Sequence, residues 1–78
     1  MVEVYLYMLR YGSENVQVGT LQILLNAYGY KDADGDTLVV DNDFGSATDY
    51  AVRNFQRDNG LNADGIVGFN TWSSLLNQ

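Results

Sequence analysis

The sequence contains no cysteine, no histidine and no proline, and only four of its 78 residues are lysine or arginine. Without histidine and cysteine, the chain cannot hold a Ser-His-Asp triad, a Cys-His nucleophile pair or an ordinary zinc site. Ten acids outnumber the four bases and give a net charge of −6. This balance argues against a nucleic-acid partner, which requires clustered lysine and arginine. The missing cysteines leave the redox compartment open.

Long hydrophobic runs are also missing. No stretch approaches the roughly 20 apolar residues that span a bilayer, so we expect no membrane partner. Glu3 lies where a signal peptide has positive charge, and the apolar run around it is short, so we expect no signal peptide in this chain. Hydrophobic residues still make up 46% of the sequence, which is enough for the modest core of one domain.

Apolar residues at three- and four-residue steps predict three short helices. The first covers residues 15–28 and is followed by Gly29, and the second covers residues 46–59 and is followed by Gly60. The third covers residues 70–76. We therefore predict an all-α fold, a small three-helix bundle, because the chain is too short for a doubly wound sheet.

Local signals refine the first helix. Ser13 or Asn15 can cap its start by offering a side-chain oxygen to an unpaired amide. Gly19, inside the helix, costs about 1 kcal/mol relative to alanine. We expect it to mark a close approach of the backbone to a neighbour.

Two β-prone segments leave an alternative open. Residues 2–8 alternate apolar and polar side chains, and residues 37–40 follow the turn signal Asp34-Gly35. The fold prediction therefore includes an optional two-stranded ribbon from these two segments, packed against the helices because such a ribbon is marginal alone.

An internal repeat precedes the second and third helices. Residues 41–48 match residues 64–71 at a constant offset of 23, from Asp41 to Asp64 and from Thr48 to Thr71. Each unit has an acid, a turn residue, an apolar residue, a glycine and a threonine in the same order. The bundle is thus predicted to contain two related helix-containing repeats.

The repeat has a readable local chemistry. Its aspartate can accept the amides of a tight turn, and Asn42 or Gly65 tolerates the positive φ that such turns use. Phe44 and Val67 are expected in the core, and the threonines can return a hydroxyl to the turn. We expect Trp72 in the core as well. The residues interpreted as scaffold are Asp41, Phe44, Gly45, Thr48, Asp64, Gly65, Gly68, Thr71 and Trp72.

Several motifs carry a resemblance to a known family. They are Leu9–Ser13 (L-x-x-G-S), Val18–Leu25 (V-x-x-L-Q-x-x-L), Gly29-Tyr30, Asp41–Thr48 (close to D-G-x-F-G-x-x-T), Ala51–Gln56 (A-V-x-x-F-Q) and Gly60–Trp72 (G-L-x-x-D-G-x-x-G-x-x-T-W). In this order, and over nearly all of Leu9 to Leu76, they resemble the peptidoglycan-binding-like domain of bacterial and phage cell-wall hydrolases. The chain departs from the family pattern at Asn42, where glycine is usual, at Ser46 and Phe69, where proline is frequent, and by extra residues at 31–39.

The resemblance implies a non-catalytic module that binds peptidoglycan, through its glycan or its stem peptide, and targets an attached or partner hydrolase to its substrate. Endolysins, autolysins and amidases are the hydrolases implied. The module would act at the cell wall or extracellular face of a bacterium, or as a phage lysis product. Residues 9–78 would form the domain and residues 1–8 an N-terminal extension or linker. No cofactor is implied.

Polar and aromatic residues that the periodicity places off the core face are the candidates for ligand contact. Aromatic rings stack on sugars, asparagine bridges amides, and arginine pairs with the carboxylates of stem peptides. These candidates are Tyr30, Asn42, Tyr50, Arg53, Arg57, Asn59, Phe69 and Asn70.

An acidic loop raises a separate metal hypothesis. Asp32, Asp34, Asp36 and Asp43 are spaced like positions 1, 3, 5 and 12 of a calcium loop. The glycine required at position 6 is Thr37, and position 12 is aspartate instead of glutamate. We predict no metal site and keep calcium as a weak candidate at these four residues.

Other functions are possible in principle. Paired carboxylates occur in glycosidases, but here the acids cluster in turns of a small bundle, so we predict that the chain is not an enzyme. The main alternative is a protein–protein interaction or self-association module, which would use the strand-like residues 2–8 as an exposed edge. The chain is expected to be a monomer or a weak dimer.

Overall fold

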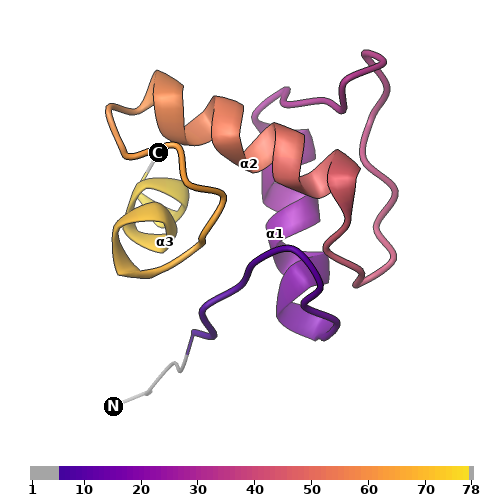
Figure 1. Cartoon of the computed structure of the whole chain (residues 1–78), viewed down its shortest axis with the longest axis horizontal. Coiled ribbons are helices and arrows are strands. Elements are labelled where there is room, and N and C mark those ends of the chain that lie inside the picture. Colours follow the sequence, from indigo (N-terminus) through magenta and orange to yellow (C-terminus); the bar gives the residue numbers. More distant parts are fainter. Residues whose placement is uncertain (1–5, 78) are drawn as a thin grey trace.

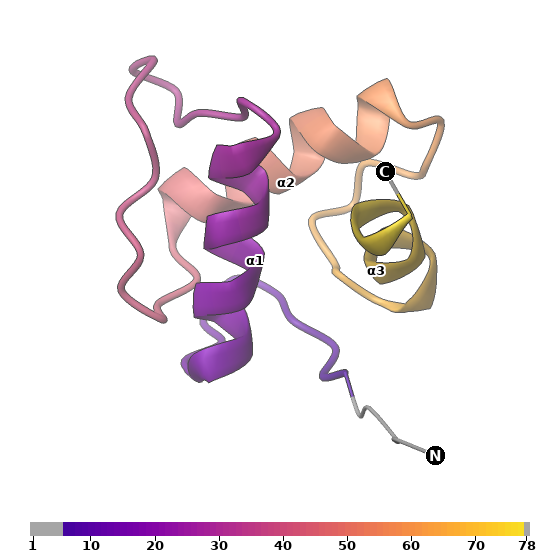
Figure 2. The ribbon, with the colours of Figure 1, turned by 180° about the vertical axis from the view of Figure 1, so that it is seen from behind.

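The computed structural model describes residues 6–77, and it contains three helices (Figure 1). They are α1 (Val16–Ala27), α2 (Ser46–Asp58) and α3 (Phe69–Leu76). Helix α2 crosses over α1, and α3 lies beside the C-terminal half of α2 (Figures 1 and 2). The predicted all-α, three-helix fold is confirmed, and each helix boundary agrees with the sequence to within one residue. No helix among residues 6–77 is long and apolar enough to cross a bilayer.

The ends of α1 explain why the sequence located it well. Of the two candidate caps, Asn15 is the one used, because its side-chain oxygen accepts the amides of Gln17 (3.0 Å) and Val18 (3.2 Å). At the other end, Gly29 has a φ of +85° and lets the amide of Tyr30 turn back to the carbonyl of Leu25 at 2.9 Å. These are local interactions between residues close in sequence, so the pattern alone reveals them.

The core gathers side chains from all three helices and from the segments that precede them. Trp72 is only 3% exposed, and Phe44 and Val67 are fully buried. The buried apolar residues are Leu9, Val18, Leu21, Leu25, Leu38, Phe44, Ala51, Val52, Phe55, Val67, Trp72 and Leu75. One continuous core therefore holds α1, α2 and α3 together.

The optional β ribbon is not formed in the part of the chain that the structure describes. Of the first predicted strand, residues 2–8, residues 2–5 lie outside the described residues. Leu9, just after this segment, forms an isolated antiparallel bridge with Val67. The backbone of Leu38 is occupied by a side chain, since Asn26 donates to its carbonyl and accepts its amide, both at 2.9 Å. Residues 37–40 therefore follow α1 as an irregular segment.

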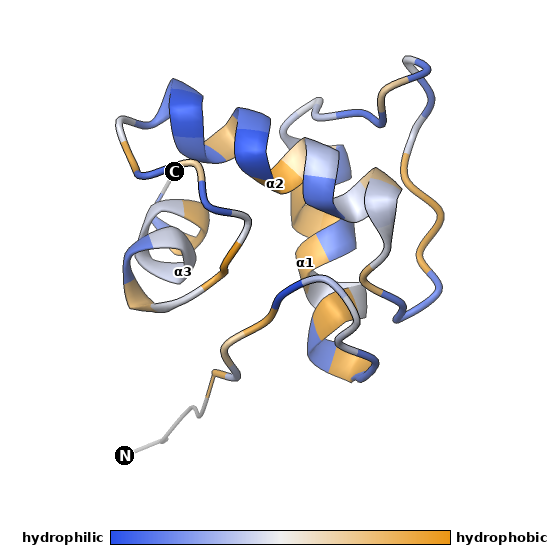
Figure 3. Cartoon of the chain, viewed as in Figure 1, coloured by the Kyte–Doolittle hydropathy of each residue, from blue (hydrophilic) through white to orange (hydrophobic). Residues whose placement is uncertain are grey.

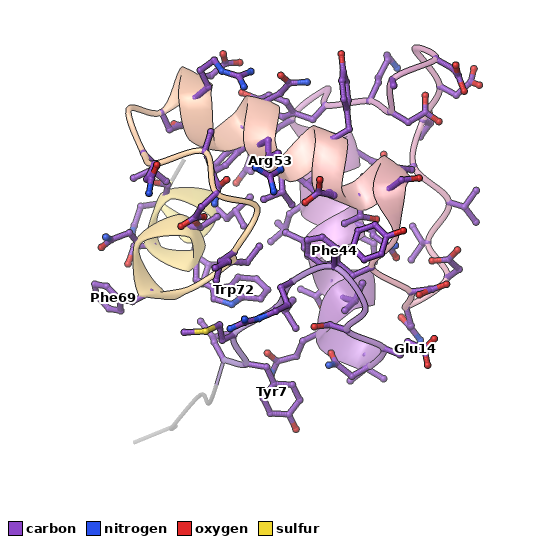
Figure 4. All side chains as sticks on the ribbon, in the orientation of Figure 1. Tyr7, Glu14, Phe44, Arg53, Phe69 and Trp72 are labelled. Carbon is purple, nitrogen blue, oxygen red and sulfur yellow. The ribbon has the colours of Figure 1, made fainter. Side chains whose placement is uncertain are left out.

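The N-terminal segment is bonded to the helices. The Tyr7 amide donates to the Gln17 side-chain oxygen at 2.5 Å, and the Trp72 indole N–H donates to the Tyr7 carbonyl at 2.8 Å. Figure 4 shows Tyr7 and Trp72 on the same side of the molecule. Residue 7, inside the predicted extension 1–8, thus connects α1 to α3.

Candidate functional site

The first repeat turn is organised around a buried glutamine. Gln22 in α1 is 1% exposed, and its side-chain nitrogen lies 3.0–3.1 Å from Asp41 Oδ1, the Asp43 carbonyl and Thr48 Oγ1. Its side-chain oxygen accepts the amides of Asp41 (3.1 Å) and Asn42 (3.2 Å). One side chain of α1 therefore fixes the whole turn that leads into α2.

The second turn repeats this arrangement one helix later. The side-chain nitrogen of Gln56 in α2 lies 3.0–3.2 Å from Asp64 Oδ1, the Ile66 carbonyl and Thr71 Oγ1. Its side-chain oxygen accepts the amide of Gly65 at 3.0 Å. The two repeats are thus similar in hydrogen bonding as well as in sequence.

Sequence reasoning singled out the turn residues but missed the two glutamines as their organisers. Both follow an apolar residue in a helix, as Leu21-Gln22 and Phe55-Gln56, and both are 1% exposed. A polar residue within an apolar stripe is the signal that could have revealed them, because a buried amide side chain needs hydrogen-bond partners. The threonines and aspartates are those partners.

The turn aspartates each accept an amide two residues on. Asp41 Oδ1 accepts the amide of Asp43 at 3.0 Å, and Asp64 Oδ1 accepts that of Ile66 at 2.9 Å. The hydrogen bond from the Gln22 side chain, followed by that from the Asp43 amide, holds the pKa of Asp41 below its usual value. Asp41 is therefore an acceptor in its turn and keeps its charge at neutral pH.

Asn42 and Gly65 occupy matched positions with positive φ, +64° and +76°. A β-carbon built on Gly65 would lie 2.5 Å from Asp49 Oδ1 and 2.9 Å from Arg53 Nη2. Asn42 instead lies against Gly19, where a β-carbon would be 2.1 Å from the Asn42 side-chain oxygen. The close approach predicted at Gly19 is therefore present, and the second turn lies directly against charged side chains of α2.

A hollow on the described surface runs along the outward face of α2. It is an open groove of about 540 Å³ between α2 and the 32–34 loop. The C-terminal half of α2 is mainly hydrophilic, and its N-terminal half is mostly of intermediate hydropathy (Figure 3). The lining residues are Asp32, Ala33, Asp34, Ser46, Ala47, Asp49, Tyr50, Arg53, Asn54 and Arg57. We call this surface the α2 groove.

Three of the predicted ligand-contact residues meet in the α2 groove. Tyr50, Arg53 and Arg57 project from successive turns of α2, and Tyr50 is 45% exposed. Arg53 is held in place: its Nε donates to Asp49 Oδ2 at 3.0 Å and its Nη1 to the Ala63 carbonyl at 3.0 Å. Arg57 contacts Asn54, with Nη1 2.8 Å from its side-chain oxygen. The groove thus combines an aromatic ring, amide groups and charges of both signs.

Two further candidates lie at a different place. Phe69 and Asn70 line a smaller hollow of about 210 Å³ at the start of α3, together with the second turn. Phe69 is 83% exposed and points away from Arg53 (Figure 4). Tertiary structure therefore splits the predicted set into two separate surfaces.

The remaining three candidates take part in local structure. The Tyr30 hydroxyl donates to Asp58 at 2.9 Å, and its ring lies edge-on to Phe55 with 5.5 Å between centroids. Burial, and then the hydrogen bond and charge of Asp58, raise the pKa of Tyr30. Asn42 belongs to the first turn, and Asn59 ends α2 with its side chain donating to the Phe55 carbonyl at 2.8 Å. The structure does not bring these three together.

The four aspartates of the calcium hypothesis do not converge. Asp32 Oδ1 accepts the amides of Asp34 (2.9 Å) and Asp36 (2.8 Å), so this carboxylate closes its own loop. Asp43 belongs to the first repeat turn, where its carbonyl accepts from Gln22. Over residues 6–77, no group of three acids is arranged to hold a metal ion. A calcium-loop spacing in the sequence has therefore not produced a calcium-loop geometry.

Comparison with known proteins gives consistent matches. The family model described as "Putative peptidoglycan binding domain" matches residues 14–75. A crystal structure of a peptidoglycan-binding protein from Clostridioides difficile, in complex with glutamine hydroxamate, is 39% identical over 88% of this chain, with a TM-score of 0.79. The Burkholderia AP3 phage endolysin is 43% identical over 88% of this chain, with a TM-score of 0.78. The chain spans 40% and 24%, respectively, of the lengths of these two proteins.

Proposed function

We propose that this chain, which belongs to the peptidoglycan-binding domain family, is a non-catalytic cell-wall binding module. Its role would be to target a hydrolase to its substrate. The hydrolase would be another domain of the same protein or a bound partner, of the endolysin, autolysin or amidase kind. The module would act at the bacterial cell wall. Two similar proteins that are longer than this chain, one of them an endolysin, support the idea of an attached hydrolase.

The α2 groove is the observation that carries the proposal. It brings together Tyr50, Arg53 and Arg57, residue types that suit sugar rings and the carboxylates of stem peptides. Its volume of about 540 Å³ is in the range of small-molecule sites and is enough for a few residues of peptide or one sugar. We therefore assign peptidoglycan contact to this groove, in preference to the smaller hollow beside Phe69.

A binding role without catalysis fits the chemistry of the groove. A glycosidase needs one carboxyl group in apolar surroundings that favour its neutral form. In the α2 groove, Asp49 instead pairs with Arg53 at 3.0 Å, and Asp32 accepts two amides of its own loop. These contacts support a surface that recognises its ligand without transforming it.

A pull-down with purified sacculi tests the function. We expect the chain to sediment with sacculi, and the replacements Tyr50→Ala and Arg57→Gln to reduce the bound fraction several-fold. Phe69→Ala is the matched control, because it removes an exposed aromatic ring from the smaller hollow and leaves the α2 groove intact.

Three results are informative. Loss of binding only in the groove variants supports the assignment. Loss of binding only in Phe69→Ala would move the site to the start of α3. A wild-type chain that stays in the supernatant with sacculi of several wall types would refute the proposed function.

A further inference from the structure

We propose that the α2 groove recognises the zwitterionic end of a diamino acid in the stem peptide, a single carbon that bears both an ammonium and a carboxylate group. This inference rests on the proposed function and names the part of peptidoglycan that the groove selects. It distinguishes diaminopimelate-type stem peptides, whose side chain ends in such a group, from lysine-type stem peptides, whose side chain ends in an ammonium group alone.

The charges of the groove are divided between its two sides. The 32–34 loop contributes the carboxylates of Asp32 and Asp34, and α2 contributes the guanidinium groups of Arg53 and Arg57. Asp49, the third acid of the lining, already pairs with Arg53 at 3.0 Å. Among residues 6–77, the lining charges outside this ion pair are therefore two carboxylates from the loop and the guanidinium of Arg57.

Arg53 is a structural part of the α2 wall. Two sides of its guanidinium are occupied, by the Asp49 carboxylate and by the Ala63 carbonyl, both at 3.0 Å. Gly65 approaches so closely that its β-carbon would lie 2.9 Å from Arg53 Nη2. These contacts from α2 and from the start of the second turn hold Arg53 in one position, paired with an acid of its own helix.

Arg57 is the residue that can read a carboxylate. Its Nη1 lies 2.8 Å from the Asn54 side-chain oxygen, which orients the guanidinium and uses one of its five N–H donors. Two adjacent N–H groups of a guanidinium match the two oxygens of a carboxylate. Arg57 is thus oriented by a neighbour and retains donors for a bidentate contact.

The loop side is arranged to accept an ammonium group. Asp32 is oriented because its Oδ1 accepts the amides of Asp34 and Asp36, and its carboxylate still carries a second oxygen. Asp34 is exposed one residue before the loop's glycine, Gly35, whose φ is +82°. Tyr50, which also lines the groove, offers its ring to the methylene groups of the diamino acid.

A zwitterion satisfies both sides at once, whereas a singly charged group does not. A lone ammonium group pairs with the loop carboxylates but leaves Arg57 without its anion. A lone carboxylate pairs with Arg57 but meets two acids across the groove. Because these charges lie at a partly solvated surface, we expect a preference of about 5- to 10-fold for the zwitterionic end.

The test compares two synthetic stem tripeptides that differ in one carboxylate. L-Ala-γ-D-Glu-meso-diaminopimelate and L-Ala-γ-D-Glu-L-Lys are titrated separately into the isotopically labelled chain, and dissociation constants come from amide shift changes. We expect the diaminopimelate peptide to bind about 5- to 10-fold more tightly, with the largest shifts along residues 46–57 and 32–34.

Variants assign the preference to its residues. Arg57→Gln should bring the two affinities to within about twofold, and Asp34→Asn should weaken both peptides. Arg10→Gln is the matched control: it makes the same change of charge at an exposed arginine outside the groove, and it should keep the preference. A thermal melt of each variant shows whether the fold is intact.

The outcomes separate this inference from the proposed function. Equal affinities in the wild-type chain, or a preference that persists in Arg57→Gln, would overturn the inference. Sedimentation with sacculi while neither tripeptide binds would also overturn it but leave the proposed function standing. Selective binding of the diaminopimelate peptide with no sedimentation on any wall would retain the groove assignment and overturn the cell-wall role.

Discussion

The replacement Gln56→Met tests whether the buried glutamines hold the two turns in place. Methionine has a similar length and fills the same space without polar groups. The change leaves the amide of the buried Gly65 without its acceptor, which lies at 3.0 Å in the native chain. The Ile66 carbonyl keeps only the Thr71 hydroxyl, at 3.5 Å. The second turn therefore loses the group that joins it to α2.

The cost follows from these contacts. A buried, unsatisfied amide costs about 1–3 kcal/mol, and burial of the methionine side chain returns part of that loss. We expect the free energy of unfolding to fall by about 2 kcal/mol. A domain of this length has a total of roughly 4–12 kcal/mol, so the loss is a large fraction of its stability. The corresponding decrease in Tm is about 8–16 °C.

The equivalent replacement in the first repeat supplies an internal comparison. The side-chain oxygen of Gln22 accepts the amides of Asp41 and Asn42, which belong to exposed residues, so water can replace it there. Gln22→Met should therefore cost less, about 1 kcal/mol. Ile23→Gln, on the exposed side of α1, is the control and should change stability by less than about 0.5 kcal/mol.

Urea unfolding followed by circular dichroism measures all three variants. We expect Gln56→Met to lose the most stability, Gln22→Met less, and the control the least. A Gln56→Met chain within about 0.5 kcal/mol of wild type, or a larger loss in Gln22→Met, would refute the argument that burial of the turn amide sets the cost.

Three further predictions concern the turns and the charges. Exchanging the matched turn residues should have unequal effects on the free energy of unfolding, measured in urea. Asn42→Gly should change it by less than about 1 kcal/mol. Gly65→Asn should lower it by about 1–3 kcal/mol, because the new β-carbon would meet Asp49 and Arg53. Folding lowers the pKa of Asp41, so its charged carboxylate stabilises the fold above the unfolded pKa of about 3.9. This stabilisation is lost as the pH falls through the folded pKa. When stability is measured during acid titration, Asp41→Asn should therefore show a shallower loss than wild type below about pH 4. With a net charge of −6, the chain gains nothing from long-range attraction to an anionic wall. Sedimentation with sacculi should therefore persist at about 0.3 M NaCl. Loss of binding at that salt concentration would contradict recognition by shape and short-range contacts.

The sequence predicted the fold well because its signals are local. Apolar spacing, the Asn15 cap and Gly29 lie within or beside the helix they define, so α1 is recognisable without its neighbours. The optional ribbon is not seen among residues 6–77, and the reason is the opposite one. Leu38 is bonded by Asn26, twelve residues earlier, and β propensity in a short run contains no information about that contact.

The candidate site was predicted only in part. Tyr50, Arg53 and Arg57 share one side of α2 because residues three, four and seven apart lie on one helix face, and the helical period alone gives this result. Phe69 was grouped with them because off-core residues on different helices cannot be assigned to one surface from their period. The two glutamines were missed because a buried polar side chain is recognised by its partners, which are 8–26 residues away.

The sequence by itself determined three helices, two matched turns and the residues that face the core, since each depends on neighbours within one or two turns of chain. Tertiary structure alone decided which charges face one another. The 32–34 loop lies opposite α2 because the segment after α1 is anchored by Asn26, and Arg53 is fixed because the second turn packs against it. Both depend on contacts between distant segments, which only the folded core brings together.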